Sequence, residues 1–322
     1  MNLQTTHRLR GVAVGAAVGD ALGMPLEFDL ASPPAKLIRD MHAGRLPAGT
    51  FTDDTEMALA LAESLLAQRM LDPQDVTSRF VDWYKRQPPD VGIHTTNVLE
   101  CIELGETWET AAATVQKRYP DSAGNGSVMR SWPVALICWH DESTLNTWSR
   151  MQSRVTHAHE ECIASSAFIN SMIAQMINGK SPFDAYQHAL TQVEMPEGLR
   201  QTIRLAPRRK RDELRNTGWV RHTVESALWG LLTTDTFEDA LVHVINLGAD
   251  ADTAGAVVGA LAGAAYGLEA IPEAWKTMLR GEWPLQSGSI WRLPDFITLA
   301  DHLAGCLTAG TAKVFKDQDQ AA

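Results

Sequence analysis

The stretch GVAVGAAVGDALG, residues 11–23, decides the fold of this chain together with GAVVGALAGAAYG, residues 255–267. Both are rich in Gly and Ala and contain few large side chains. Glycine costs about 1 kcal/mol relative to alanine inside a helix, so close packing must offset several such penalties. We therefore expect two central helices that neighbouring helices approach closely. Packing alone explains these glycines without any functional role.

An acidic group adjoins each of these two expected helices. Asp20 and Glu27 lie near the end of the first, and Asp250 and Asp252 precede the second. If the two helices pack against each other, Asp20, Glu27 and the Asp250 cluster share one neighbourhood.

Helical patterns cover most of the remaining sequence. Buried-face spacing of i, i+3, i+4, i+7, i+8 runs from Ala58 to Leu66, and residues 160–177 form an apolar segment that Asn178-Gly179 ends. Further helices are expected at 108–118, 182–193, 219–232, 237–248, 272–279 and 294–307. Alternating β-branched runs are missing, and so is a fixed-period repeat. The sequence predicts one compact all-α domain over residues 1–312, followed by a polar tail, 313–322, that we expect to fray.

The composition limits the classes of function. A formal net charge of -11 argues against a nucleic-acid binder that relies on a broad basic surface. The same charge means that an anionic substrate needs local positive charge, which divalent cations would supply. Four widely spaced cysteines without a CxxC pair are typical of reduced thiols, and we expect a cytoplasmic protein.

One segment imitates a signal peptide. Arg8 and Arg10 precede an apolar run, but Asp20 interrupts it and Pro25 and Glu27 occupy the cleavage region. We interpret it as a core helix. The apolar run 254–267 is too short to span a bilayer, so no membrane-spanning segment is expected.

Two acidic motifs stand about two hundred residues apart: Thr52-Asp53-Asp54-Thr55 and Asp250-Ala251-Asp252-Thr253. Thr and Asp are ordinary residues at helix starts, so capping explains either motif alone. Each motif nevertheless offers more such residues than a cap needs, and paired carboxylates favour a nearby cation. Hard oxygen ligands suit Mg²⁺ or Mn²⁺. If the fold brings the motifs together, they form a binuclear metal site.

Three further segments have two interpretations each. The loop Gly124-Asn125-Gly126-Ser127-Val128-Met129-Arg130 either presents backbone N–H groups to a phosphate, with Arg130 nearby, or simply turns into a helix. His157 and His159 are acid–base groups, sugar contacts or surface residues. Asp90 is a functional carboxylate or a turn former after Pro88-Pro89.

A basic run, Arg208-Arg209-Lys210-Arg211, stands out in this acidic chain. A solvated helical face explains it, and a docking patch for an acidic protein partner is the alternative. Trp219 follows in the next loop and either stacks on a base or anchors the next helix.

Taken in chain order, these segments resemble the ADP-ribosylglycohydrolase family. The resemblance runs from about residue 8 to residue 275. It rests on five stretches in order, which are Gly19–Gly23 with Glu27, Phe51–Met57, Gly124–Arg130, Thr156-His157, and Asp250–Thr253 followed by Gly255-Ala256. Within the family the chain looks closest to the bacterial dinitrogenase reductase-activating glycohydrolase branch, through Pro89–Gly92 and Thr234–Phe237.

The resemblance implies an all-α fold around a central binuclear Mg²⁺ or Mn²⁺ site. It assigns metal binding to Thr52, Asp53, Asp54, Asp250, Asp252 and Thr253. It assigns catalytic roles to Glu27 and Asp90. It assigns substrate contacts to Gly124, Asn125, Gly126, Ser127, Met129, Arg130, His157 and Trp219. The chain departs from the family pattern at two places. Ala249 replaces a glycine and is tolerable only at negative φ, and Ile93-His94 replaces a polar contact.

The implied reaction is hydrolysis of the N-glycosidic bond between ADP-ribose and a protein arginine, in nitrogen regulation or in immunity to a toxin. Two alternatives remain. One is a hydrolase of the same family that acts on another linkage or on a free ADP-ribose derivative. The other is a non-catalytic protein that binds ADP-ribose.

Overall fold

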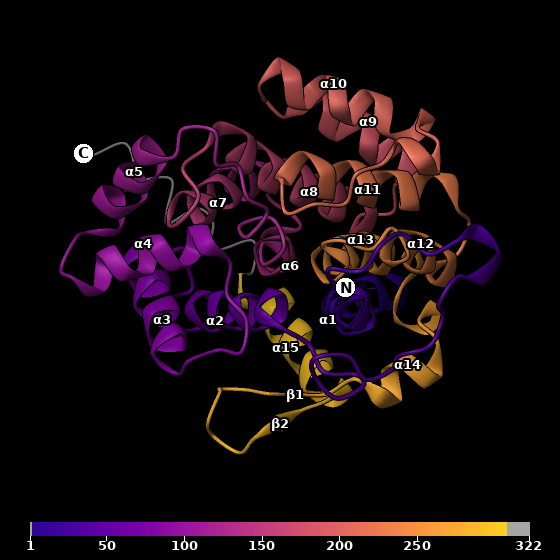
Figure 1. The fold of residues 1–322 in the computed structure, drawn as a ribbon, viewed down its shortest axis with the longest axis horizontal. Coiled ribbons are helices and arrows are strands. Elements are labelled where there is room, and N and C mark those ends of the chain that lie inside the picture. The colour runs from indigo at the N-terminus through magenta and orange to yellow at the C-terminus, as the bar shows by residue number, and fades with distance from the viewer. Residues whose placement is uncertain (1, 308–322) are drawn as a thin grey trace.

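Two antiparallel helices at the centre of the molecule, α1 (Leu3–Gly23) and α13 (Ala251–Tyr266), organise a computed structural model that describes residues 2–307 (Figure 1). Helix α1 also packs on α15 (Leu293–Cys306), and α13 packs on α11 (Val220–Thr233) and α12 (Phe237–Ile245). Through these contacts, the α1–α13 pair brings helices from both ends of the described residues together.

The other helices surround this pair and build the domain. They are α2 (Asp53–Gln68), α3 (Pro73–Lys85), α4 (Ile93–Glu103), α5 (Trp108–Arg118), α6 (Trp132–Cys138), α7 (Glu142–Arg154), α8 (Glu160–Ile177), α9 (Pro182–Gln192), α10 (Glu197–Leu205) and α14 (Glu273–Met278). Within residues 2–307 the only strands are β1 (Gly281–Glu282) and β2 (Ile290–Trp291), an antiparallel pair with Gly281 opposite Trp291. The predicted all-α fold is confirmed. The predicted tail at 313–322 lies outside the described residues.

The glycines of α1 and α13 face each other across the helix contact. A methyl group on Gly19 would lie 2.0 Å from the carbonyl oxygen of Gly255, and one on Gly259 would lie 2.0 Å from that of Gly15. Gly11 and Gly263 form a third such pair. Any side chain here would collide with the opposite backbone, so the two helices touch only because Cβ atoms are missing. The predicted close packing is confirmed.

The direction of this contact places the acidic residues. Because α1 and α13 run antiparallel, the C-terminal end of α1 meets the N-terminal end of α13, where Gly23 contacts the backbone of Ala251. Asp20 in the last turn of α1 and Asp252 in the first turn of α13 therefore lie at the same end of the pair. The expectation that packing would gather the acidic groups is confirmed.

Helix α1 is also the segment that imitates a signal peptide. Residues 3–26 are long and apolar enough to cross a membrane by length and composition, yet 89% of their most apolar window is buried inside the fold. Asp20 itself is fully buried. The structure agrees with the interpretation of this segment as a core helix.

Candidate active site

The two acidic motifs meet at the starts of α2 and α13. Thr253 Oγ1 donates a hydrogen bond to Asp54 Oδ2 at 3.3 Å, and Thr52 Oγ1 lies 3.4 Å from the same oxygen. Asp250 raises the pKa of Asp54, and Asp54 raises the pKa of Asp252, although about two hundred residues separate the two motifs in sequence. The fold thus brings the two motifs together, as a single metal site formed by both of them requires.

Capping does not explain these residues. Asp20, on α1, accepts hydrogen bonds from the backbone N–H and hydroxyl groups of both Thr52 and Thr55, at 2.5 to 3.2 Å. It therefore satisfies the first turn of α2 from outside, and neither Thr52 nor Asp250 caps its helix with its side chain. Helix starts need such acceptors because their first N–H groups lack partners. The capping interpretation is therefore wrong for Thr52 and Asp250, the N-cap residues of α2 and α13.

The carboxylates of the motifs are electrostatically unsatisfied. Burial raises the pKa of Asp54 well above its usual range, and Asp20, Asp53 and Asp250 raise that pKa further. Burial and the charges of Asp54 and Asp250 raise the pKa of Asp252 in the same way. Asp54 Oδ1 is buried and accepts no hydrogen bond from the described residues. A set of buried, hard oxygen donors with an unused carboxylate oxygen fits a divalent cation.

The raised pKa values predict how stability depends on pH in a chelating buffer. Burial raises the pKa of Glu56 from 4.5 to about 8, although Trp83 Nε1 donates to its Oε2 at 2.7 Å, and burial raises the pKa of Asp20 to about 6. A carboxyl group with a raised pKa in the folded protein stabilises the fold at low pH, and this stabilisation disappears as pH rises through the raised value. We expect the melting temperature, measured by circular dichroism, to fall as pH rises from about 5 to about 8.

A matched variant isolates one group in this titration. Glu56→Gln removes the carboxyl group whose pKa is about 8, so its melting temperature should fall less steeply than that of the unmodified protein above pH 6, about the value for Asp20. A melting temperature that stays constant or rises from about pH 5 to about pH 8 in both proteins would contradict these shifts.

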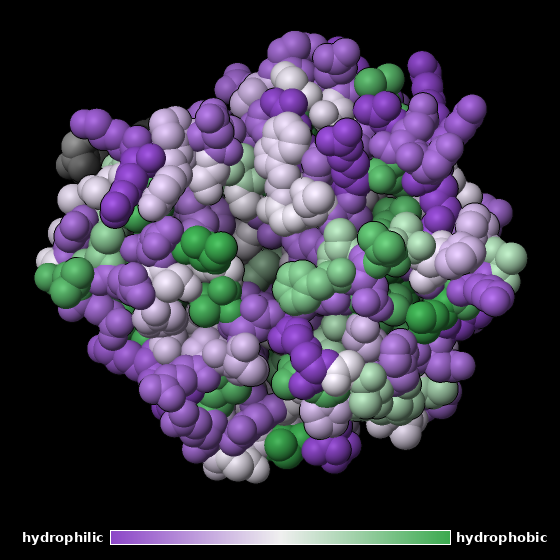
Figure 2. Space-filling view, viewed as in Figure 1, coloured by the Kyte–Doolittle hydropathy of each residue, from purple (hydrophilic) through white to green (hydrophobic). Residues whose placement is uncertain are grey.

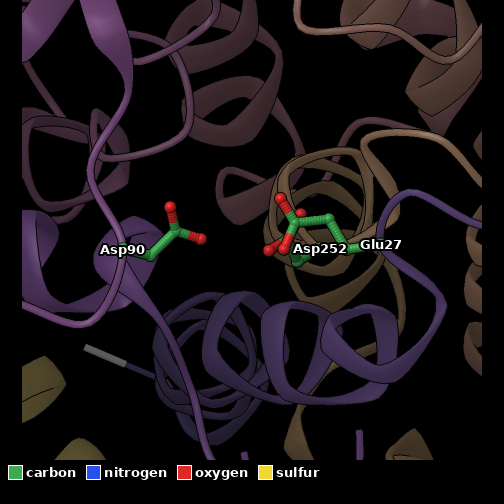
Figure 3. Close-up of side chains that lie close together, drawn as sticks. All are labelled: Glu27, Asp90 and Asp252. Carbon is green, nitrogen blue, oxygen red and sulfur yellow. The ribbon is translucent and has the colours of Figure 1, made fainter. Parts of the chain in front are cut away.

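A second carboxylate group lies beside the motifs and spans the cleft. Glu27, after α1, Asp90, before α4, and Asp252 bring three carboxylate oxygens within 4.8 Å of one another. Figure 3 shows Asp90 facing the other two from across the gap. The pKa of Glu27 is raised by burial, lowered by Arg45 and raised by Asp90. The two predicted catalytic residues are therefore neighbours.

Arg45 holds this group together, and sequence reasoning missed it. Its Nη2 lies 2.5 Å from Glu27 Oε2, 2.5 Å from Asp90 Oδ2 and 3.2 Å from Asp252 Oδ2, and its Nε donates to Glu27 Oε2 at 2.9 Å. Arg45 stands in an irregular connection, GRLPAG, that carries no recognisable motif. Only the fold shows its position.

The acidic residues form the floor of a cleft of about 780 Å³. Its walls include Gly124, Asn125, Gly126, Met129 and His157 of the predicted substrate-binding set. Phe28, Leu30 and Ile93 also line it and are 80%, 93% and 84% exposed. Figure 2 shows green, hydrophobic side chains around a hollow near the centre of this face. The cleft thus combines an acidic floor with a hydrophobic rim.

The glycine loop is fixed by the segment before α11 and orients a carboxylate. Asn125 N donates to Gly218 O at 3.0 Å, and Gly124 forms a bridge with Trp219. Asn125 Nδ2 donates to Asp250 Oδ2 at 2.6 Å. The loop is therefore tied directly to the second acidic motif.

Two members of the predicted substrate-binding set are buried in the core and do not line the cleft. Ser127 is fully buried and its hydroxyl bonds to that of Ser153. Arg130 is fully buried as well, with its guanidinium 4.4 Å above the Phe80 ring, and burial lowers its pKa to about 9. The expected phosphate contact of Arg130 is corrected by this geometry, because its side chain points into the core.

Arg130 acts on the cleft through His157. Arg130 Nη2 donates to Thr156 Oγ1 at 2.8 Å, and that oxygen lies 2.8 Å from His157 Nδ1. The Thr156 hydroxyl thus links the Arg130 guanidinium to the His157 ring. Burial, His94 and Arg130 lower the pKa of His157 well below its usual range, so His157 is a neutral imidazole at the cleft wall.

His94, one of the departures from the family pattern, also lines the cleft. Its ring centroid lies 4.6 Å from that of His157, with the ring planes tilted by 34°, and its Nε2 lies 3.1 Å from Thr156 O. His159 instead accepts a hydrogen bond from Glu161 N at the start of α8. Of the histidines considered, His94 and His157 belong to the cleft and His159 to a helix cap.

Trp219 lies beside the cleft and is absent from its described walls. It is 39% exposed and borders a shallow hollow that shares Gly124 and Gly218 with the cleft. Arg221 lies 4.9 Å above its ring. The structure therefore places Trp219 at the outer edge of the site.

Two other sequence expectations are corrected. Ala249 has φ of +54°, so the requirement of a negative φ is wrong. The left-handed region costs an L-residue about 1–2 kcal/mol, and backbone hydrogen bonds with Phe28 and Asp29 hold Ala249 there.

The basic run Arg208–Arg211 does not form one helical face. It spans two short 3₁₀ turns, Arg209 pairs with Glu225, and Arg211 donates to Asn246 O. Docking at this run remains a prediction.

Comparisons with known proteins give the relatives of this chain. The model of the ADP-ribosylglycohydrolase family matches residues 1–309. The ADP-ribosylarginine hydrolase Tri1 of Serratia proteamaculans (strain 568) is 35% identical over 287 residues, which cover 84% of this chain and 75% of that protein. The ADP-ribosyl-[dinitrogen reductase] glycohydrolase of Rhodospirillum rubrum is 33% identical over 278 residues, which cover 84% and 90%. A solved structure described as an ADP-ribosylglycohydrolase-related protein complex aligns with a TM-score of 0.77 and 31% identity, over 94% of this chain and 99% of that chain.

Proposed function

The chain belongs to the ADP-ribosylglycohydrolase family, and from this premise we propose that it is a metal-dependent hydrolase that removes ADP-ribose from arginine side chains of proteins. The observation that carries the proposal is the convergence of the two hard-oxygen motifs on the floor of the cleft, beside Glu27 and Asp90. The names of the relatives support the arginine linkage.

The residues that would hold two divalent cations, Mg²⁺ or Mn²⁺, surround the starts of α2 and α13. They are Thr52, Asp53, Asp54, Asp250, Asp252 and Thr253. Bound cations supply positive charge and Lewis acidity to a floor that otherwise repels a pyrophosphate. The orphaned Asp54 Oδ1 supports this assignment.

The walls of the cleft would bind and orient the ADP-ribose. Gly124 and Gly126 leave room beside the His157 ring, where an added methyl group on Gly126 would lie 2.9 Å from His157 Cε1. The neutral His157 imidazole would contact a phosphate or ribose oxygen. Met129 and Asn125 complete this wall.

Glu27 and Asp90 would act on the bond that breaks. Cleavage at the anomeric carbon develops positive charge on the ribose, and the departing guanidine needs a proton. Both carboxylates lie within hydrogen-bonding distance of one guanidinium nitrogen, that of Arg45, so both reach the position of a guanidine. One of them holds the proton and the other keeps the guanidinium in place.

A substrate panel tests the proposal. Conjugates of ADP-ribose with arginine, with serine and with a small molecule are incubated with the protein, with and without Mn²⁺, and free ADP-ribose is quantified. We expect Mn²⁺-dependent release from the arginine conjugate. Release from the serine conjugate alone would show that the enzyme acts on the serine linkage instead. Binding of ADP-ribose without release from any conjugate would show that the protein is a non-catalytic binder.

Asp90→Asn tests the catalytic assignment. Loss of a proton-handling carboxylate should lower kcat by about 100-fold or more. Affinity for free ADP-ribose and Mn²⁺ content, measured by calorimetry and metal analysis, should stay unchanged because Asp90 lies outside the two motifs. Full activity of the variant would remove Asp90 from the mechanism.

A further inference from the structure

The guanidinium of Arg45 occupies a site that the reaction itself requires. The proposed function calls for a pocket that binds the guanidinium of a target arginine beside Glu27 and Asp90. In the structure, those two carboxylates and Asp252 already surround Arg45 Nη2, at 2.5, 2.5 and 3.2 Å. A second guanidinium cannot share the same oxygens at these distances. Arg45 and a bound target arginine therefore exclude each other.

A second hollow adjoins Arg45 and Asp90 in the chain. The main cleft is lined by Glu27 and Asp90 themselves. The second hollow, of about 280 Å³, has among its walls Leu46 and Pro89, the chain neighbours of Arg45 and Asp90. The remaining walls are Thr50, Phe51, Glu56, Arg86, Gln87, Glu282, Leu285 and Gln286. The Arg45–Asp90 contact therefore stands next to two wall residues of this hollow, Leu46 and Pro89.

The hollow has the chemistry that an arginine side chain needs. Leu46, Phe51 and Leu285 offer apolar surface for three methylene groups. Glu282 adds a carboxylate and Arg86 a guanidinium to the same walls, so the attraction for a cationic head comes from the Glu27–Asp90 pair. Arginine side chains bury their stems against apolar surface and pair their guanidinium with carboxylates. The hollow therefore suits the stem, and the Glu27–Asp90 pair suits the head.

The segment that carries Arg45 is built to release it. Residues 40–49 contain neither helix nor strand. Both ends are fixed: Ile38 exchanges two 2.8 Å hydrogen bonds with the Asn246 side chain, and Gly49 O accepts from Arg280 N at 2.9 Å. The side chain of Arg45 is 28% exposed. Its side chain can leave the carboxylates by rotation while the anchors hold the backbone.

We propose that this hollow, the Leu46–Leu285 hollow, receives the target arginine, and that Arg45 closes it by occupying the carboxylates until the target guanidinium replaces it. Arg45 is thus an internal competitor of the leaving group and a determinant of arginine specificity. The inference rests on the proposed function, because that function supplies the arginine.

Agmatine, a free guanidinium on an alkyl stem, is the probe for the test. Its affinity for the Mn²⁺-loaded protein is measured by calorimetry for the unmodified chain, Arg45→Gln and the control Arg39→Gln. Arg39 loses the same charge, but it lies outside the cleft and pairs with Glu238 and Asp239. We expect about tenfold tighter agmatine binding for Arg45→Gln, which corresponds to closure in about nine of ten molecules. Arg39→Gln should bind agmatine as the unmodified chain does.

A second variant tests the hollow separately. Leu46→Trp fills it, so agmatine binding in the Arg45→Gln background should return towards the value of the unmodified chain, while affinity for free ADP-ribose stays constant. Equal or weaker agmatine binding by Arg45→Gln overturns the competitor role, and insensitivity to Leu46→Trp overturns the hollow. Agmatine binding requires no hydrolysis. If no conjugate in the substrate panel is hydrolysed but agmatine binds as expected, the proposed activity is wrong and this inference stands. If the arginine conjugate is hydrolysed but agmatine does not bind as expected, this inference is wrong and the proposed activity stands.

Discussion

Gly259→Ala is expected to destabilise the protein by about 3 kcal/mol or more, because the added methyl group would lie 2.0 Å from the carbonyl oxygen of Gly15. Backbone atoms cannot turn away as a flexible side chain does, so α1 and α13 would have to separate along their length. The free energy of unfolding, measured by urea titration, checks this result. Recovery of the Gly259→Ala variant only as insoluble protein would be the most severe form of this destabilisation.

Gly305→Ala is the matched control for this prediction. Gly305 lies in α15, and a methyl group added there would meet no atom within 4 Å. The same substitution should therefore leave stability unchanged or raise it by up to about 1 kcal/mol, as alanine favours helix. Changes within about 0.5 kcal/mol in both variants would contradict the role given to the glycine contacts.

Asp54→Asn should abolish turnover and stabilise the chelated protein. A lost carboxylate at the proposed metal site is expected to lower kcat/KM by about 1000-fold or more, or roughly 4 kcal/mol. In chelating buffer, the same change removes a buried charge that Asp20, Asp53 and Asp250 repel, so the melting temperature should rise. Activity assays and thermal unfolding in EDTA measure the two effects.

The opposite signs of these effects distinguish a metal ligand from a structural aspartate. Asp72→Asn is the control, since Asp72 caps α3 by accepting from Gln74 N, and asparagine caps a helix equally well. It should change neither turnover nor stability. A lower melting temperature for Asp54→Asn in EDTA would contradict the repulsion seen at the site, and near-normal turnover would contradict metal binding by Asp54.

The parts of the fold that sequence predicts best are those that depend on local composition. The glycines of α1 and α13 indicated close packing because a missing Cβ is visible in the sequence itself. The boundaries of α8 agree with the prediction because its apolar run and its Asn178-Gly179 stop are both local. Helix α10 was not predicted, since only Leu199 and Ile203 are buried in it and two residues make no clear periodicity.

Within the site, the residues that sequence misjudged act over long sequence distances. Asp20 satisfies the start of α2 from 32 residues away, so the motif itself looked like its own cap. The charge of Arg130 suggests a contact at the surface, yet its guanidinium lies in the core, where it donates hydrogen bonds to Gln152 and Thr156. Arg45 stands in a connection without a motif, and only tertiary structure brings it to Glu27 and Asp90.

The antiparallel pairing of α1 with α13 also determines when the site can form during synthesis of the chain. Thr253, which bonds to Asp54, follows it by 199 residues, an interval of about 10–40 s at translation rates of roughly 5–20 residues per second. Throughout that interval the nascent chain exposes the glycine stripe of α1 without its partner. The metal ligands stay incomplete for the same time. The site can therefore assemble only after α13 has been synthesised, and a chain that stops before α13 leaves the ribosome without it.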